Sequence, residues 1–257
     1  MISALLFMAS ALAIPTDSIQ KAFAGHSGAF VLIECSSNET FRSDAAACAE
    51  RLAPCSTFKI WNSAIGLESG AIADPDALFW KWDGTKRWLE TWNADQTLRS
   101  AFAASCVPAY QDLARRIGRE RMQEWLDKIG YGDRNISSGL DVFWLPQPPD
   151  RKTLLVTPDE QALMIARLVG GKLPFSVKTL AAVKSIMQLQ TTEHGTLFGK
   201  TGTGGDEKGN YNMGWFVGYV ESAGKTHAFA CLLKGHGVMG KDARAATEDI
   251  LKRQGLL

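Results

Sequence analysis

The sequence predicts an α/β fold in which an antiparallel sheet is flanked by helices and carries an inserted all-helical lobe. Three observations lead to this prediction. Strand patterns lie towards both ends of the 257-residue chain, helix patterns fill the middle, and a short turn joins two strands near the C-terminus. If strands from both ends build one sheet, the middle of the chain is an insertion. A site is then expected in the cleft between the lobes.

The composition is that of an ordinary globular protein, with 46% hydrophobic and 21% charged residues. The chain has 28 Lys and Arg against 27 Asp and Glu, a formal net charge of +1. This balance argues against a nucleic-acid partner, which selects for a basic excess. No apolar run reaches about 18 residues, so no stable membrane association is expected. The protein is expected to be a monomer or a homodimer.

Residues 1–13 are predicted to be a signal peptide. Ile2–Ala13 is apolar and has the length of a signal-peptide core, and Ala11–Ala13 resembles an A-x-A cleavage site. No basic residue precedes Lys21, so the alternative is an ordinary buried N-terminal helix. A signal peptide implies a periplasmic or secreted protein that begins near Ile14.

The cysteine count is odd, which leaves at least one free thiol or a pair between chains. Export would permit a disulfide among Cys35, Cys48 and Cys55, which lie close together in the sequence. The remaining cysteines are Cys106 and Cys231. No two are at C-x-x-C spacing, and the pairing stays open.

The first elements are a buried strand and a buried helix. Ala29–Glu34 has the apolar run of an interior strand, and a polar loop follows to Asp44. Ser56–Leu67 has the length of a helix and is apolar on most of its surface, so it is expected inside the protein. Its few polar side chains therefore need partners or a function.

Helices and a hairpin follow a tryptophan-rich stretch that spans residues 80–92. Gly118 is expected to break a helical region, and Thr157 with Glu160 forms a capping box. The later elements are expected to be helices over 108–117, 119–129, 158–169 and 176–187, hairpin strands over 213–221 and 226–234, and a closing helix over 241–253. The predicted domains are a sheet domain of residues 14–57 and 190–257 and a helical lobe of residues 58–189.

Several familiar motifs are excluded by their context. Gly235–Gly240 matches G-x-G-x-x-G, but the chain ends too soon for a second parallel strand and an acidic residue. The glycines of Gly195–Thr201 are one residue too close for a P-loop. The four histidines lack H-E-x-x-H spacing, so no metal is expected, and no G-x-S-x-G elbow is present.

Ser-x-x-Lys occurs three times, but only Ser56 and Lys59 open an apolar helix. A spacing of three residues places the hydroxyl and the amine on one helical face. Burial lowers the pKa of a lysine by up to about 3–5 units, and a neutral lysine can accept a serine proton. The alternative is that Ser56 only caps the helix while Lys59 extends to solvent.

Two further patterns favour the catalytic interpretation. Lys200-Thr201-Gly202 is the only K-[ST]-G in the chain and stands just before the hairpin. Ser105-Cys106-Val107 precedes a helix in the middle of the chain. The chain therefore presents a serine–lysine helix, then a middle serine and then a K-T-G strand. This is the order of motifs in the penicillin-recognising serine enzymes.

Six separated motifs together resemble a class D (OXA-type) serine β-lactamase, from about Ala29 to Leu257. They are PCSTFKIWNSAIGLESG (54–70), SCV (105–107), YGD (131–133), SSGLDVFWL (137–145), KTG (200–202) and NMGWFVGYV (212–220). The resemblance implies the serine β-lactamase and penicillin-binding-protein transpeptidase fold. It also implies a small-molecule substrate, a penicillin-type β-lactam whose amide bond is hydrolysed.

The resemblance implies a role for each residue at the reacting centre. Ser56 would be the acylated nucleophile and Lys59 the general base, carboxylated on Nζ by CO2 (N6-carboxylysine) and needing no other cofactor. Trp144 would donate its indole N–H to the carbamate, with Phe58 and Val107 shielding it. Packing alone would also explain a tryptophan at this position.

The resemblance also assigns the proton relay and substrate binding. Ser105 would pass a proton to the leaving nitrogen. The Lys200-Thr201-Gly202 strand would bind the carboxylate side of the substrate, together with Arg244 of the last helix. Backbone N–H groups of Ser56 and Thr203 would form the oxyanion hole.

Three departures from the family pattern are present. Asp133 stands where the family usually has Asn, Cys106 is the middle residue of Ser-x-Val, and Thr203 follows K-T-G where relatives often have an aromatic residue. The extra carboxylate could weaken binding of an anion or face away from it. The alternatives to a hydrolase are a β-lactam sensor that acylates without efficient turnover, and a cell-wall transpeptidase or carboxypeptidase.

Overall fold

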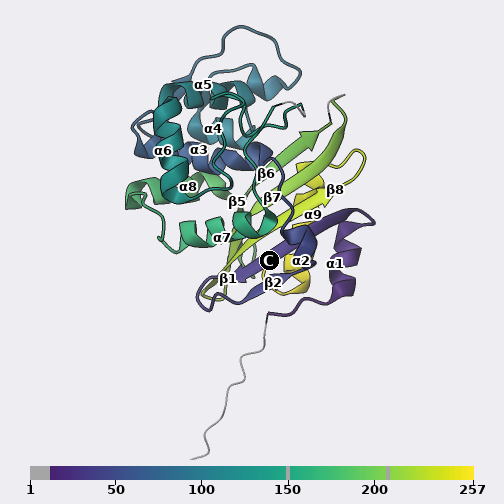
Figure 1. The fold of residues 1–257 in the computed structure, drawn as a ribbon. Coiled ribbons are helices and arrows are strands. Elements are labelled where there is room, and N and C mark those ends of the chain that lie inside the picture. The colour runs from purple at the N-terminus through teal and green to yellow at the C-terminus, as the bar shows by residue number, and fades with distance from the viewer. Residues whose placement is uncertain (1–11, 149–150, 207–208) are drawn as a thin grey trace, which may run out of the picture.

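The computed structural model describes residues 12–148, 151–206 and 209–257 and shows one antiparallel sheet beside a helical lobe (Figure 1). The strand order is β2-β1-β8-β7-β6-β5. The strands are β1 (Ser27–Glu34), β2 (Thr40–Arg42), β5 (Gln188–Thr191), β6 (Thr196–Gly205), β7 (Tyr211–Ser222) and β8 (Lys225–Lys234).

The sheet joins the two ends of the chain, as predicted. β1 pairs antiparallel with β8, with Phe30 opposite Cys231, and β8 continues from β7 through a two-residue turn. Ala223 and Gly224 in this turn have φ of 48° and 75°, the left-handed values that suit the twist of a two-residue hairpin. The fold class predicted from the sequence is confirmed.

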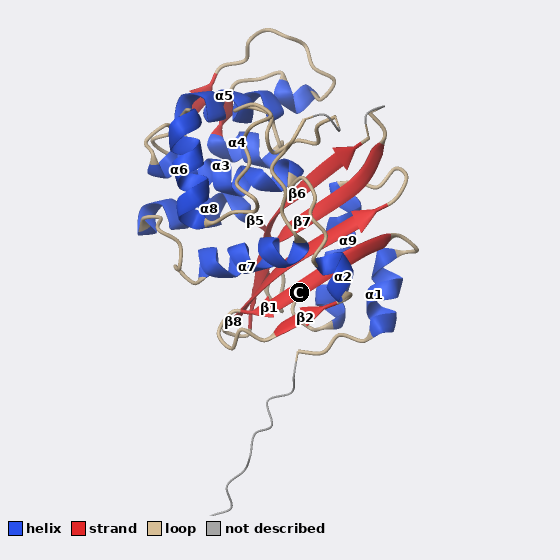
Figure 2. Ribbon diagram, viewed as in Figure 1, coloured by secondary structure: helices blue, strands red, loops and turns tan. Residues whose placement is uncertain are grey.

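Each face of the sheet has its own hydrophobic core, because successive residues of a strand point to opposite faces. Phe30 and Leu32 pack towards α1 (Thr16–Phe23) and α9 (Gly240–Arg253). Val31 and Ile33 belong to a larger core that continues into the helical lobe. Figure 2 shows α1 and α9 on one side of the red sheet and α7 (Pro158–Val169) on the other.

The helical lobe follows the first strands. It contains α3 (Lys59–Glu68), α4 (Leu98–Ala103), α5 (Val107–Ile117), α6 (Arg119–Ile129) and α8 (Val177–Met187), with a 3-10 turn, η2 (Glu90–Trp92). A two-stranded pair of β3 (Leu78–Trp80) and β4 (Gln96–Thr97) is also present. This pair was not predicted, because strands of three and two residues are too short to show alternation. The helix α7 packs against β8 and β1 of the sheet. The division into domains made from the sequence assigns this helix to the helical lobe, and that division stays a prediction.

The predicted helix boundaries are largely confirmed. Gly118 separates α5 from α6. The capping box at Thr157 and Glu160 is present, with 3.0 Å hydrogen bonds in both directions. The segment at Ser56 differs: a 3-10 turn, η1 (Cys55–Phe58), precedes α3, so Ser56 lies in the turn and not in the α-helix. A short helix, α2 (Ala45–Cys48), lies between β2 and η1.

All five cysteines lie in the described residues and carry free thiols, so no disulfide joins Cys35, Cys48 and Cys55. Burial raises the pKa of the Cys55 and Cys231 thiols to about 12, which disfavours their reactive thiolates. Most of the predicted signal peptide, residues 1–11, lies outside the described residues. Within those residues, no helix has the length and apolar character needed to cross a membrane.

Candidate active site

The reacting pair is Ser56 and Lys59, whose Oγ and Nζ atoms are 2.9 Å apart. Ser56 projects from η1 and Lys59 is the first residue of α3. The Lys59 side chain is fully buried. Burial, reinforced by the Lys200 cation, holds the pKa of Lys59 well below its usual value. An uncharged amine beside a serine hydroxyl can accept its proton, and the structure gives no support to a solvent-directed Lys59.

Strand β6 supports the turn that carries Ser56. A Cβ atom on Gly202 would lie 3.1 Å from the Pro54 carbonyl oxygen, and one on Gly204 would lie 3.2 Å from Cys55 Sγ. Cys55 itself has a φ of 52°, in the left-handed region that non-glycine residues seldom adopt. The third residue of the K-T-G motif is therefore needed as glycine so that β6 and η1 can approach closely.

A second serine–lysine pair faces the first. Lys200 Nζ donates to Ser105 Oγ at 3.1 Å and to the Thr201 carbonyl oxygen at 3.1 Å. Lys200 is 5% exposed, and burial lowers its pKa to about 7. Ser105 has a φ of 52°, and the loop before it is held by a 2.9 Å bond from Trp92 Nε1 to the Ala104 carbonyl oxygen. The structure thus brings together the three motifs that the sequence separates.

Arg244 lies beside the K-T-G strand, as the resemblance implied. Lys200, Thr201 and Arg244 line one cavity of about 130 Å³, together with Phe102 of α4. The Arg244 Nε donates to Glu248 Oε1 at 2.7 Å, one turn further along α9. Two basic side chains and a hydroxyl at one cavity are suited to binding a small anion.

Thr203 fixes the start of α9. Its Oγ1 accepts a 3.0 Å hydrogen bond from the Gly240 N–H. A Cβ atom on Gly240 would lie 2.6 Å from the Gly202 carbonyl oxygen, so the helix begins in direct contact with β6. The Thr203 side chain therefore positions the helix that carries Arg244, a role the sequence did not indicate.

Trp144 is fully buried and lies next to the residue that precedes Lys59. Its ring stacks on Phe58, with centroids 5.8 Å apart and planes at 19°. Its indole N–H is buried and has no hydrogen-bond partner among the described residues. Buried donors are nearly always satisfied, so this N–H calls for an acceptor as well as a packing role. Val107, at the start of α5, is half-buried.

Asp133 acts as a turn residue. It is exposed, and its Oδ1 accepts backbone N–H groups from Leu155 at 3.0 Å and Asn135 at 3.2 Å. The carboxylate that departs from the family pattern thus holds the loop after Tyr131 against residue 155.

A buried hydrogen-bond chain behind Ser56 was missed in the sequence. The Tyr131 hydroxyl donates to Gln161 Oε1 at 2.9 Å, and Gln161 Nε2 donates to Thr57 Oγ1 at 2.8 Å. Thr57 in turn donates to the Pro54 carbonyl oxygen at 2.7 Å. The available signal was a glutamine on the apolar stripe of α7, between Pro158 and Ile165.

The fold and the site define the class of protein. Residues 28–253 match the family model described as the penicillin binding protein transpeptidase domain. The chain is 37% identical over 240 residues to the probable β-lactamase YbxI of Bacillus subtilis (strain 168), covering 93% of this chain and 85% of the relative. It is also 37% identical over 204 residues to β-lactamase OXA-10 of Pseudomonas aeruginosa, covering 79% and 74%.

Solved structures agree with these relatives. A class D β-lactamase from Bacillus subtilis superposes with a TM-score of 0.86 at 36% identity, covering 95% of this chain and 99% of that one. The chain belongs to the class D serine β-lactamase family. It is also 32% identical over 231 residues to the regulatory protein BlaR1 of Bacillus licheniformis, covering 90% of this chain but 37% of that protein. The C-terminal domain of the Bacillus licheniformis BlaR penicillin receptor superposes with a TM-score of 0.86 at 29% identity, covering 95% and 96%.

Replacement of Gln161 by leucine tests the chain of hydrogen bonds behind Ser56. The Gln161→Leu variant should lose roughly 1–3 kcal/mol of stability, because the buried Tyr131 hydroxyl is left without its acceptor. Thr57 loses the bond from Gln161 but keeps its bond to the Pro54 carbonyl oxygen. Chemical denaturation measures this loss. The exposed Gln20→Leu on α1 is the control and should unfold like the unmodified protein. Equal stability of the two variants would show that the chain does not anchor the turn.

Proposed function

We propose that this protein hydrolyses the β-lactam amide bond of penicillin-type antibiotics through an acyl-enzyme on Ser56. The observation that supports this proposal most directly is the 2.9 Å contact between Ser56 Oγ and a fully buried Lys59 amine. Family membership supports the class of substrate. The role proposed for each residue rests on the geometry of this site.

Acylation forms one bond and breaks another. Ser56 Oγ attacks the lactam carbonyl carbon while the base at Lys59 accepts the hydroxyl proton. The carbon–nitrogen bond breaks, and the leaving nitrogen takes the Ser105 hydroxyl proton. The proton that the base took from Ser56 replaces it on Ser105, so the base at Lys59 is free again for deacylation. The backbone N–H groups of Ser56 and Thr203 stabilise the oxyanion.

Deacylation consumes one water. The water attacks the ester carbonyl carbon, gives its proton to the base at Lys59, and releases Ser56 with its hydroxyl restored. The product is the ring-opened carboxylate. During both steps, Lys200, Thr201 and Arg244 hold the substrate carboxylate in the cavity that they line.

We propose that CO2 carboxylates Lys59 on Nζ. Two features of the described residues fit the modification: a buried amine whose pKa is lowered, and the buried Trp144 N–H without a partner. Only an uncharged amine attacks CO2, and Phe58 and Val107 would provide apolar walls. When bound, the group supplies a carboxylate-like proton acceptor. No other cofactor is proposed.

A β-lactam sensor is the second candidate, and the similarity to BlaR1 and to the BlaR penicillin-receptor domain favours it specifically. A sensor would use the same Ser56 acylation but would retain the acyl group. The two functions therefore differ in deacylation alone. We also propose export to the periplasm or the medium, directed by residues 1–13, and action as a monomer or homodimer.

Turnover of a chromogenic cephalosporin separates the two candidates. The hydrolase hypothesis predicts many turnovers per molecule and complete loss of activity, by at least about 10³-fold, in Ser56→Ala. Stoichiometric labelling without turnover would instead identify a sensor. If Ser56→Ala reacted like the unmodified protein, every role assigned to Ser56 would be wrong.

Carboxylation of Lys59 predicts a distinct carbon signal. Protein incubated with ¹³C-bicarbonate should show one carbamate resonance, which Lys59→Ala removes and Trp144→Phe weakens because the indole donor is gone. Added bicarbonate should also raise turnover. A carbamate signal that persists in Lys59→Ala would place the modification on another amine.

The lowered pKa of Lys200 predicts a pH dependence of substrate binding. Lys200 is a cation below about pH 7 and neutral above it, so attraction for a carboxylate decreases as pH rises through this value. The KM of an anionic β-lactam should rise by about tenfold across that range, whereas its neutral methyl ester should not respond. Steady-state kinetics between pH 5.5 and pH 8.5 (roughly 1.5 units on either side of neutral) measures this. Parallel profiles for both substrates would contradict a charge effect at Lys200.

A further inference from the structure

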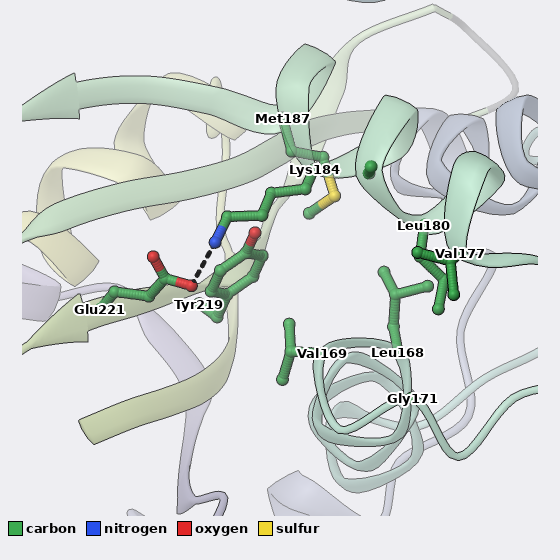
Figure 3. A pocket seen from close by; sticks show the side chains of 10 residues that line it. Leu168, Val169, Gly171, Val177, Leu180, Lys184, Met187, Tyr219 and Glu221 are labelled. Carbon is green, nitrogen blue, oxygen red and sulfur yellow. Dashed lines mark hydrogen bonds and ion pairs between the residues drawn. The ribbon is translucent and has the colours of Figure 1, made fainter. Parts of the chain in front are cut away.

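A second cavity lies between α7, α8 and β7, separate from the active site (Figure 3). Its volume is about 230 Å³. Leu168, Leu180 and Met187 form apolar walls, and it shares no lining residue with the cavity of Lys200 and Arg244.

Tyr219 lines this cavity, and its hydroxyl is free to donate a hydrogen bond. The residue is 1% exposed, and its ring stacks on Phe198 with centroids 4.5 Å apart and planes at 5°. In the described parts of the chain, the hydroxyl makes no hydrogen bond. In Figure 3 the hydroxyl lies on the α8 side of the cavity, beside Lys184. The hydroxyl is therefore available to donate to an acceptor on a molecule in the cavity.

The rim of the cavity carries one charge of each sign. Lys184 Nζ lies 2.6 Å from Glu221 Oε1, as the dashed line in Figure 3 shows, and also 5.2 Å from the centre of the Phe198 ring. These two charges neutralise each other, so the rim offers no free charge to offset the loss of water from a charged ligand. The rim therefore favours an uncharged ligand.

We propose that this cavity binds a compact uncharged molecule with an apolar ring and one hydrogen-bond acceptor for Tyr219. An apolar cavity of about 150 Å³ holds a benzene ring, so the volume here accommodates one ring with a short polar substituent. The walls bury the ring, and the acceptor takes the Tyr219 O–H. This inference does not depend on the proposed hydrolase function.

The test is a titration of the isotope-labelled protein with benzamide, followed by NMR chemical shifts. Shifts should concentrate on Leu180, Met187 and Tyr219 and leave Thr201 and Arg244 unmoved, with a Kd in the millimolar range expected for about nine non-hydrogen atoms. Benzoate, which has a similar shape and a negative charge, should bind more weakly because its carboxylate would lose water with no free cation to compensate. Shifts centred on Arg244, or tighter binding of benzoate, would overturn the proposal.

Tyr219→Phe isolates the hydroxyl, because it keeps the ring and its stack on Phe198. This variant should weaken benzamide binding about fivefold, the effect of one net hydrogen bond, and leave toluene binding unchanged. Tyr211→Phe removes a hydroxyl from the same strand outside the cavity and should bind benzamide normally. If Tyr219→Phe bound benzamide as tightly as Tyr211→Phe, the proposed acceptor contact would be wrong.

Discussion

The burial of the Lys59 amine against Ser56 is the constraint on which the site depends. A lysine in water is a cation and cannot take a proton, so the chemistry requires an environment in which the charged form is unfavourable. The protein provides it by placing Lys59 as the first residue of a helix that is buried almost throughout. The aromatic cluster of Phe58, Phe143 and Trp144 packs next to this position. An amine with a single hydrogen-bond partner is costly to bury, and the large core around it offsets that cost.

The remaining structure keeps three separated segments in contact at this amine. Glycines at 202 and 204 let β6 approach the turn that bears Ser56, and Thr203 fixes the start of α9. Gln161 holds the same turn through its hydrogen bond to Thr57. A strand, a helix and a loop therefore converge on one nucleophile, and each uses a short backbone contact or a buried hydrogen bond.

The similarity to both hydrolases and a penicillin receptor has a simple physical meaning. Acylation needs only a nucleophile, a base and an oxyanion site, whereas turnover also needs a base that acts again on water. The buried Trp144 N–H without a partner bears on this difference if Lys59 is carboxylated as proposed, because the carbamate would be an acceptor for it. The stability of that acceptor would decide how long an acyl group remains on Ser56.

The sequence alone determined the fold class, most helix boundaries and the motif residues, because these depend on local patterns such as apolar periodicity, capping boxes and short spacings. It identified Ser56, Lys59 and Lys200 before any contact was known. Tertiary structure decided that Lys59 is fully buried, that Lys200 meets Ser105, and that Asp133 serves a turn. It also revealed Gln161 and the cavity at Tyr219. These features arise from contacts between residues far apart in the chain, and local sequence patterns carry no information about such distances.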